Sequence, residues 1–222
     1  MKVELVAYTP DPQRVVASSV QACHGKTIKS GETLKDEDIR RLIEMVKTSG
    51  HHSVMEHASF TFAVSGVSRV LTHQLVRHRI ASYSQQSQRY VNLRGGGYVT
   101  PRSLKEGDAK EVFKSHVESS LRAYQQLLDM GIAKEDARYV LPNAAKTNIV
   151  ITMNARALWN FFSLRTCRRA QDEIRQLALN MLTEVYRIAP VLFEDAGAPC
   201  VRGPCPEGKY SCKKPMKKGD FC

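Results

Sequence analysis

RHRIASYSQQSQR, residues 77–89, is the most informative stretch of this sequence. It holds three arginines, a histidine and three serines. Arg77, His78 and Arg79 are followed after seven residues by Ser87, and Arg89 comes two residues later. An arginine guanidinium stays charged and presents a planar fork that suits bidentate contact with phosphate. A hydrophobic core does not accept such a segment. The stretch is therefore either a solvated basic loop, the commoner case for this composition, or an anion-binding site.

The composition is that of a globular protein with an excess of positive charge. Of 222 residues, 42% are hydrophobic and 25% are charged, which suits one large domain or two small ones. The 33 Lys and Arg against 22 Asp and Glu give +11, a surplus that suits a nucleotide or a nucleic acid as partner. No apolar run approaches the roughly 20 residues of a membrane span, and the N-terminal MKVELVAYTP lacks the features of a signal peptide. We therefore expect a cytoplasmic protein without a membrane partner.

Hydrophobic periodicity predicts a helix-rich α+β fold with a modest mixed or antiparallel sheet. Period-two alternation, as in Phe60, Phe62 and Val64, indicates strands, and apolar residues at i, i+3, i+4 and i+7 indicate helices. The predicted strands are residues 3–8, 59–64 and 147–153, and the predicted helices are 35–48 with Thr33 as cap, a stripe from Val67 to Leu75, 108–130 followed by Gly131, 134–140, one opened by Asn154, and one from Ile174 that ends near Pro190. The triplet Gly95-Gly96-Gly97 lacks the strand–helix context of a dinucleotide fingerprint, so we expect no Rossmann domain.

Polar residues gather where the predicted elements end. The Arg-His-Arg triplet follows a helix and runs into a polar loop, whereas Asn154-Ala155-Arg156 lies where a strand meets a helix start, a place that favours anions. Arg156 and Asn160 are four residues apart and share one helix face. Arg165 follows an aromatic run, and it either lines a pocket or extends along the edge of the core.

The Arg-His-Arg triplet, followed after seven residues by Ser87, resembles the signature of the flavin-dependent thymidylate synthases. The resemblance extends over roughly residues 33–190 and includes the segments His51-His52-Ser53 with Glu56-His57, Ala137-Arg138 to Pro142, and Asn154-Ala155-Arg156 through Asn160 to Arg165. It implies a methyltransferase that converts dUMP to dTMP. It also implies a homotetramer whose active sites draw residues from several subunits.

The resemblance assigns site residues by their place in the family motifs. It implies that FAD contacts Ser53, Arg77, His78, Arg79, Gln85, Asn154, Ala155, Arg156 and Asn160. It implies that dUMP is bound by Gln74, Arg77, Gln85, Gln86, Ser87, Gln88, Arg89, Arg138 and Arg165. Some members carry Glu where this chain has Gln85, which leaves the contacts of that side chain open.

The chemistry that the resemblance implies is a reductive methylation. FAD is the cofactor, 5,10-methylenetetrahydrofolate donates the carbon and NADPH is the reductant. Arg165 is the expected catalytic residue, because a guanidinium beside the pyrimidine stabilises negative charge that develops on the ring. Arg89 and Arg138 are expected to neutralise the 5′-phosphate, and Ser87 to hydrogen-bond there without being an obligatory nucleophile. Two other classes stay open: a nucleic-acid-binding protein, which the resemblance does not favour, and a flavin redox protein unrelated to dUMP.

The C-terminal segment differs from the rest in composition. We expect a synthase domain over residues 1–195 and a Cys- and Lys-rich tail over 196–222. Four, six and nine residues separate the tail cysteines Cys200, Cys205, Cys212 and Cys222, whereas zinc sites prefer closer C-x2-4-C pairs. A cytosolic protein keeps its thiols reduced, which argues against a disulfide framework. We expect a mobile basic tail and no metal site, with an opportunistic metal site as the main alternative, and we assign capping, core or other structural roles to His51, His52, His57, Cys23 and Cys167.

Overall fold

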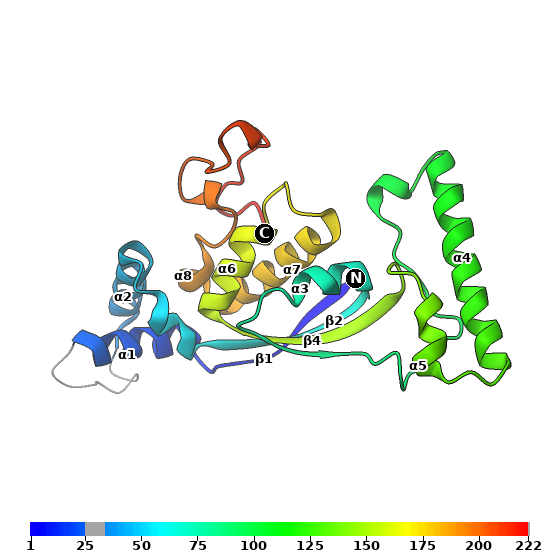
Figure 1. The fold of residues 1–222 in the computed structure, drawn as a ribbon. Helices are drawn as coiled ribbons and strands as arrows, with labels where there is room; N and C mark the ends of the chain where they lie inside the picture. Colours follow the sequence, from blue (N-terminus) through cyan, green and yellow to red (C-terminus); the bar gives the residue numbers. More distant parts are fainter. Residues whose placement is uncertain (25–33, 222) are drawn as a thin grey trace. The chain divides into compact units, whose positions relative to one another are not determined.

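The computed structural model describes residues 1–24 and 34–221, which form a helix-rich α+β fold as the sequence predicts (Figure 1). The strands are β1 (Lys2–Tyr8), β2 (Ser59–Ser68), β3 (Ser82–Gln85) and β4 (Lys146–Asn154). The α-helices are α1 (Pro12–His24), α2 (Asp36–Ser49), α3 (Arg69–Leu75), α4 (Asp108–Asp129), α5 (Lys134–Ala137), α6 (Ala155–Arg165), α7 (Asp172–Ile188) and α8 (Pro190–Phe193). Short 3₁₀ turns include η2 (His52–His57), η3 (Arg102–Leu104) and η4 (Arg138–Val140). Among these described residues, no helix is long and apolar enough to span a membrane.

The four strands pair in the order β1-β2-β4-β3 and form a small antiparallel sheet. Alternate residues of the central strands are buried, including Phe60 and Phe62 of β2 and Ile149 and Ile151 of β4. This alternation arises because successive side chains of a strand point to opposite faces. The period-two alternation that predicted the strand at 59–64 is therefore also the pattern of its burial.

Packing divides the chain into two compact units. Unit 1 comprises Met1–Lys2, Val64–Arg77 and Tyr83–Val150, and unit 2 comprises Val3–Ala63, His78–Ser82 and Ile151–Cys222. Each strand contributes residues to both units. The described part of the tail clusters with unit 2.

Each unit has its own buried residues. Unit 1 contains α3, α4, α5 and η4, with Leu71, Leu75, Val117 and Tyr124 buried. Unit 2 contains α1, α2, η2, α6, α7 and α8, and α6 packs beside α7 (Figure 1). The core of unit 2 includes an aromatic chain of Phe60, Phe193, Phe162 and Phe161, whose successive ring centroids are 5.5, 6.1 and 5.7 Å apart.

Several elements depart from the predictions. α1, β3 and α8 were not predicted, β2 extends four residues beyond Val64, and Val67 belongs to β2 instead of the helical stripe. α1 forms because Val16, Ala17 and Val20 are buried on one of its faces, and that burial outweighs the weak helix propensity of Val and Ser. Thr33 lies outside the described residues, and the residue before α2 is Lys35, whose side chain makes no capping bond. Gly131 has a φ of 84°, the left-handed conformation expected just after a helix.

Candidate active site

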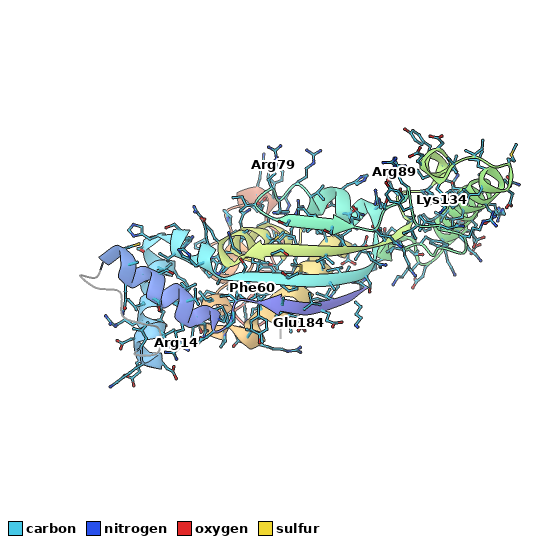
Figure 2. The ribbon with its side chains drawn as sticks, turned by 90° about the horizontal axis from the view of Figure 1, so that it is seen from below. Arg14, Phe60, Arg79, Arg89, Lys134 and Glu184 are labelled. Atoms are coloured by element: carbon cyan, nitrogen blue, oxygen red, sulfur yellow. The ribbon has the colours of Figure 1, made fainter. Side chains whose placement is uncertain are left out.

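In unit 1, the segment after β3 forms a turn that presents Ser87 and Arg89. The Ser87 hydroxyl accepts the backbone N–H of Arg89 at 3.2 Å, and the Ser87 carbonyl accepts the N–H of Val91 at 3.0 Å. The Lys134 ammonium of α5 donates to the carbonyl of Tyr90 at 3.0 Å, and so attaches this turn to α5 (Figure 2). The signature serine therefore shapes the turn that carries Arg89.

Glu135 of α5 links the two arginines that were assigned to the substrate phosphate. Both Nε and Nη2 of Arg89 lie 2.7 Å from Oε2 of Glu135. Arg138 Nε donates to the backbone carbonyl of the same glutamate at 3.0 Å. Two guanidiniums that are far apart in the sequence thus meet at one short helix.

Arg69, the first residue of α3, joins this group and was not singled out from the sequence. Burial, and secondly the charge of Arg138, lower the pKa of Arg69. A cation at a helix start opposes the helix dipole, so this placement is itself a signal that the residue serves another purpose. We call Arg69, Arg89 and Arg138 the arginine cluster. Of the three guanidiniums, only that of Arg89 is paired with the carboxylate of Glu135, so the cluster keeps a net positive charge that suits an anion.

Gln85 is held by two threonine hydroxyls at the end of β3. Its Nε2 donates to Thr72 Oγ1 at 3.1 Å and to Thr147 Oγ1 at 3.4 Å. The Thr72 hydroxyl donates its own proton to the carbonyl of Arg69 at 3.0 Å. Thr72 is therefore an acceptor toward residue 85, which suits an amide and not a carboxylate.

Apart from Arg165, the remaining predicted substrate residues also lie in unit 1. Tyr83 fixes β3 against α3 by donating its hydroxyl to the carbonyl of Leu75 at 2.9 Å, and burial raises the pKa of Tyr83 to about 12. The polar run that was expected to be a loop is thus partly a strand. Gln74, Gln86 and Gln88 are half-buried and Arg77 is exposed.

In unit 2, the structure pairs His78 with Arg165, 87 positions later. Arg165 Nε donates to His78 Nε2 at 3.0 Å, and the His78 ring meets Phe161 edge-on at 5.0 Å between centroids. Burial, and secondly the charge of Arg165, lower the pKa of His78 to about 4. A neutral imidazole at physiological pH leaves Nε2 free of a proton, as an acceptor requires.

The start of α6 carries the other predicted cofactor residues. Asn154 Oδ1 caps the helix by accepting the N–H of Ala157 at 2.8 Å. Ala155 is buried and donates its N–H to the carbonyl of Ala58 at 2.7 Å, so it fixes the position of the helix start. Arg156 forms an ion pair with Glu56 of η2.

The exposed donors of unit 2 suit a ligand with a pyrophosphate, as FAD has. Arg156 and Asn160 are exposed on one face of α6, and Ser53 is exposed on η2. Arg79 is exposed and extends away from the ribbon (Figure 2). Guanidiniums and hydroxyls of this kind make charge-assisted bonds to phosphate oxygens. The donor chemistry fits the cofactor that the resemblance implies.

The structure therefore gathers the predicted residues into two groups, and the division runs through the signature triplet. Arg77 belongs to unit 1, with Gln74, Gln85, Gln86, Ser87, Gln88, Arg89 and Arg138. His78 and Arg79 belong to unit 2, with Ser53, Asn154, Ala155, Arg156, Asn160 and Arg165. Glu135, Arg69 and Thr72 were missed because their roles depend on contacts between distant parts of the sequence.

Comparisons with known proteins agree with one another. The family model described as "Thymidylate synthase complementing protein" matches residues 4–191. The flavin-dependent thymidylate synthase of Geobacter sulfurreducens is 50% identical over 219 residues, which cover 96% of this chain and 94% of that protein. The synthase of Clostridium tetani is 47% identical over 239 residues, which cover 98% and 96%. The crystal structure of the UMP/dUMP methylase PolB from Streptomyces cacaoi, bound with 5-Br dUMP, superposes with a TM-score of 0.75 at 32% identity and covers 87% of this chain and 93% of that one.

Proposed function

This chain belongs to the family of flavin-dependent thymidylate synthases, and on that premise we propose that it methylates dUMP to dTMP. In this proposal 5,10-methylenetetrahydrofolate donates the carbon and NADPH is the reductant. The observation that best supports it is the arginine cluster, in which Arg89 and Arg138 meet at Glu135 beside the turn shaped by Ser87. A nucleotide monophosphate requires such a concentration of fixed positive charge.

The phosphate of dUMP would replace Glu135 as a partner of Arg89. The side chains of this ion pair are 51% and 48% exposed, so solvent screens the pair and its exchange costs little. A dianionic phosphate accepts bidentate bonds from the same guanidinium fork. Glu135 then holds Arg89 in place before substrate arrives, and Arg69 and Arg138 add charge to the same site.

Arg165 would act on the pyrimidine ring. With Nε committed to His78, the two terminal nitrogens of its guanidinium remain to face a ligand. Methylation at C5 needs negative charge to develop on the ring, and a fixed guanidinium stabilises that charge more than it stabilises neutral substrate. His78 keeps the orientation of the guanidinium without adding a positive charge of its own.

The flavin would be held by Ser53, Arg77, His78, Arg79, Gln85, Asn154, Ala155, Arg156 and Asn160. When bound, it supplies the reducing equivalents that convert a methylene group to a methyl group. Arg79 and Arg156 bind the negative charge of the cofactor, and Asn154 holds the start of α6 in the conformation that presents Arg156. The chain's own contribution is binding and orientation.

We further propose that four copies of the chain assemble, with active sites shared between subunits. Large apolar side chains are exposed on both units, including Ile80 at 74%, Tyr139 at 84% and Met130 at 77%. Exposed apolar surface of this kind commonly marks a contact with another protein. Sedimentation velocity should give the mass of a tetramer, and a stable, active monomer would contradict this part of the proposal.

The deciding experiment is tritium release from 5-tritiated dUMP with methylenetetrahydrofolate and NADPH. We expect release only when all three are present and the protein carries the yellow colour of bound flavin. A coloured protein that releases no tritium would instead be a flavin redox protein unrelated to dUMP. A colourless protein whose nucleic-acid affinity falls steeply with salt would be a nucleic-acid-binding protein. Because the PolB methylase is described for UMP and dUMP, tritiated UMP belongs in the same assay.

A further inference from the structure

The tail has too few buried apolar groups to explain its conformation. From Pro199 to Phe221 its regular structure consists of two 3₁₀ turns, η5 (Pro199–Val201) and η6 (Gly208–Tyr210). Among the described residues from Pro199 onward, Met216 and Phe221 are the only buried ones. Segments with so small a core need a disulfide, a metal ion or another covalent or coordinate link to hold one structure.

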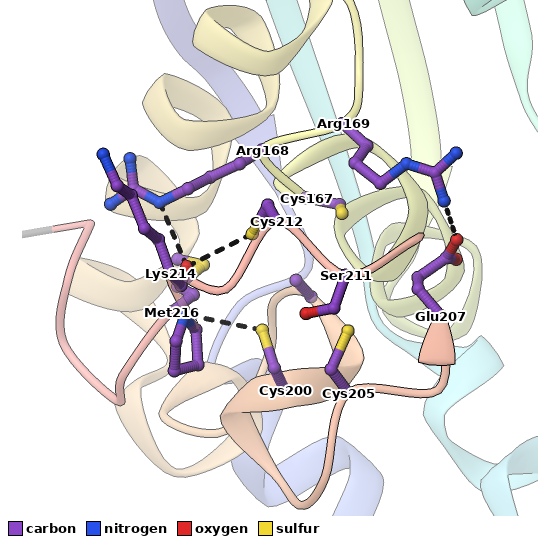
Figure 3. Close-up of a pocket in the computed structure, with 12 residues that line it drawn as sticks. Cys167, Arg168, Arg169, Cys200, Cys205, Glu207, Ser211, Cys212, Lys214 and Met216 are labelled. Carbon is purple, nitrogen blue, oxygen red and sulfur yellow. Dashed lines mark hydrogen bonds and ion pairs between the residues drawn. The ribbon is translucent and has the colours of Figure 1, made fainter. Parts of the chain in front are cut away.

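Four cysteines surround a small cavity where the tail meets the loop between α6 and α7 (Figure 3). Cys167 comes from that loop, and Cys200, Cys205 and Cys212 come from the tail. All four side chains are half-buried, whereas most tail residues between them are exposed. All four are free thiols. The cavity of about 20 Å³ has room for a single water-sized occupant or one ion.

The surroundings of the cavity suit a site with net negative charge. Three cationic residues, Arg168, Arg169 and Lys214, line it along with the thiols, against one carboxylate, Glu207, which is paired with Arg169. The N–H of Met216 donates to Cys200 Sγ at 3.3 Å, a bond that a thiolate accepts more strongly than a thiol does. Four thiolates together with one divalent cation have a net charge of minus two. The cationic side chains that line the cavity and the N–H of Met216 offset part of that charge.

We propose that Cys167, Cys200, Cys205 and Cys212 bind one structural Zn²⁺ ion. Thiolate ligands select zinc and other soft or borderline metals, and a closed set of four cysteines is a usual structural zinc site. Cys200 and Cys205, with four residues between them, fall at the wide end of the spacing of zinc-binding pairs. Of the other two ligands, Cys212 belongs to the tail and Cys167 lies far upstream, so the spacing of the tail cysteines does not reveal the full set.

The thiols must move inward when the ion binds. Among the residues that the structure describes, no three His, Cys, Asp or Glu side chains are already spaced to share a metal ion. In this proposal the cysteine side chains rotate toward the cavity that they line, and metal binding commonly completes the folding of its site. The ion would tie the tail to the loop that begins just after Arg165, the last residue of α6.

Metal content of the purified protein tests the proposal. Protein purified in reductant, without added metal, should contain on the order of one zinc per chain by inductively coupled plasma mass spectrometry. Cys205→Ser should lower that content by on the order of tenfold or more, since it removes one of four ligands. Cys23→Ser is the matched control, because Cys23 is an exposed cysteine of α1 outside the cavity lining, and it should keep its zinc.

A second measurement needs no variant and so does not depend on whether Cys205→Ser folds. Wild-type holoenzyme is stripped with a chelator under reducing conditions and titrated with Co²⁺. Tetrahedral thiolate coordination should give intense d–d bands at wavelengths longer than oxidised flavin absorbs. Stripping should also raise the rate of tryptic cleavage at Lys209 and Lys213 by on the order of tenfold.

Three results would overturn the proposal. The first is protein that holds no zinc and develops no cobalt bands. The second is iron in place of zinc at the same stoichiometry. The third is a disulfide among the four cysteines of freshly purified, reductant-protected protein. Zinc binding with no tritium release would refute the proposed enzyme activity alone and leave the zinc site standing.

Discussion

Arg165 Nε donates a hydrogen bond to His78 Nε2 across 3.0 Å, and this contact joins the last residue of α6 to the middle of the signature triplet. The imidazole is neutral because burial and the neighbouring guanidinium both oppose its protonation. A motif residue expected to contact the cofactor therefore also positions the residue expected to act on the substrate.

Replacing His78 should slow turnover more than it weakens substrate binding. His78→Ala removes the acceptor that orients Arg165, so we expect kcat to fall by on the order of tenfold to a hundredfold, with a smaller change in KM for dUMP. His78→Gln keeps an acceptor oxygen and should recover part of that loss. The test is to measure kcat and KM for dUMP by steady-state kinetics, with the flavin content of each protein determined by absorbance. Full activity of a flavin-loaded His78→Ala protein would show that Arg165 needs no such support.

The low pKa of His78 predicts a pH dependence of stability. The unfolded chain binds the His78 proton with a pKa near the ordinary 6.5, and the folded chain with a pKa of about 4. Between these values the unfolded state holds more protons, so this residue makes the free energy of unfolding rise with pH from 4 to 6.5 and contributes no slope above. Urea denaturation at pH 5 and pH 7.5 should show a smaller pH effect in His78→Gln than in wild type. An unchanged pH effect would mean that His78 titrates alike in both states.

Substitutions at Arg165 should act on the chemical step. Arg165→Ala should reduce kcat by on the order of a hundredfold to a thousandfold, since charge on the pyrimidine builds only as the reaction proceeds. Arg165→Lys keeps the charge but loses the planar fork, and should also be slow. Flavin binding and reduction by NADPH should persist in both proteins. Normal dTMP formation by Arg165→Ala would contradict this role and would make Arg89 the next candidate for the group that activates the ring.

Removing an arginine of the cluster should weaken dUMP binding with little effect on kcat. A phosphate contact is present in both ground state and transition state, so Arg138→Ala should raise KM for dUMP by on the order of tenfold to a hundredfold. Arg122→Ala removes an exposed arginine of α4 in the same unit and is the matched control. Isothermal titration with dUMP provides an independent measure. Equal affinities of the two variants would place the phosphate elsewhere.

Gln85→Glu tests whether an amide is required at the end of β3. The carboxylate would face Thr72 Oγ1, whose proton is already donated to Arg69. We expect the free energy of unfolding to drop by about 1–2 kcal/mol at pH 8 and to recover partly at acid pH, where the new carboxyl is protonated and can donate. Gln126→Glu, at an exposed position of α4, is the control. Unchanged stability would show that the threonines reorient to donate.

The local sequence was sufficient to predict most of the helices and strands and to recognise the family. The alternation around Phe60 and Phe62, the apolar spacing of α4 and α7, and the cap at Asn154 are short-range patterns, and each formed as predicted. Local propensity did not predict α1, which forms because one of its faces is buried. It also did not predict β3, in which a polar run pairs with a neighbouring strand. The Arg-His-Arg-x7-Ser signature depends on spacing alone, so it could be recognised without a structure.

Only the tertiary structure brought distant residues together. The Arg165 contact of His78, the bridge that Glu135 makes between Arg89 and Arg138, and the meeting of Cys167 with the tail cysteines each join separate segments of the sequence. Such contacts follow from how buried faces pack, and no local spacing records which distant side chain will fill a given position. The sequence therefore determined which chemical groups are present and on which elements they lie. Packing decided which of them share a site and, through burial and neighbouring charge, that His78 is neutral where an acceptor is needed.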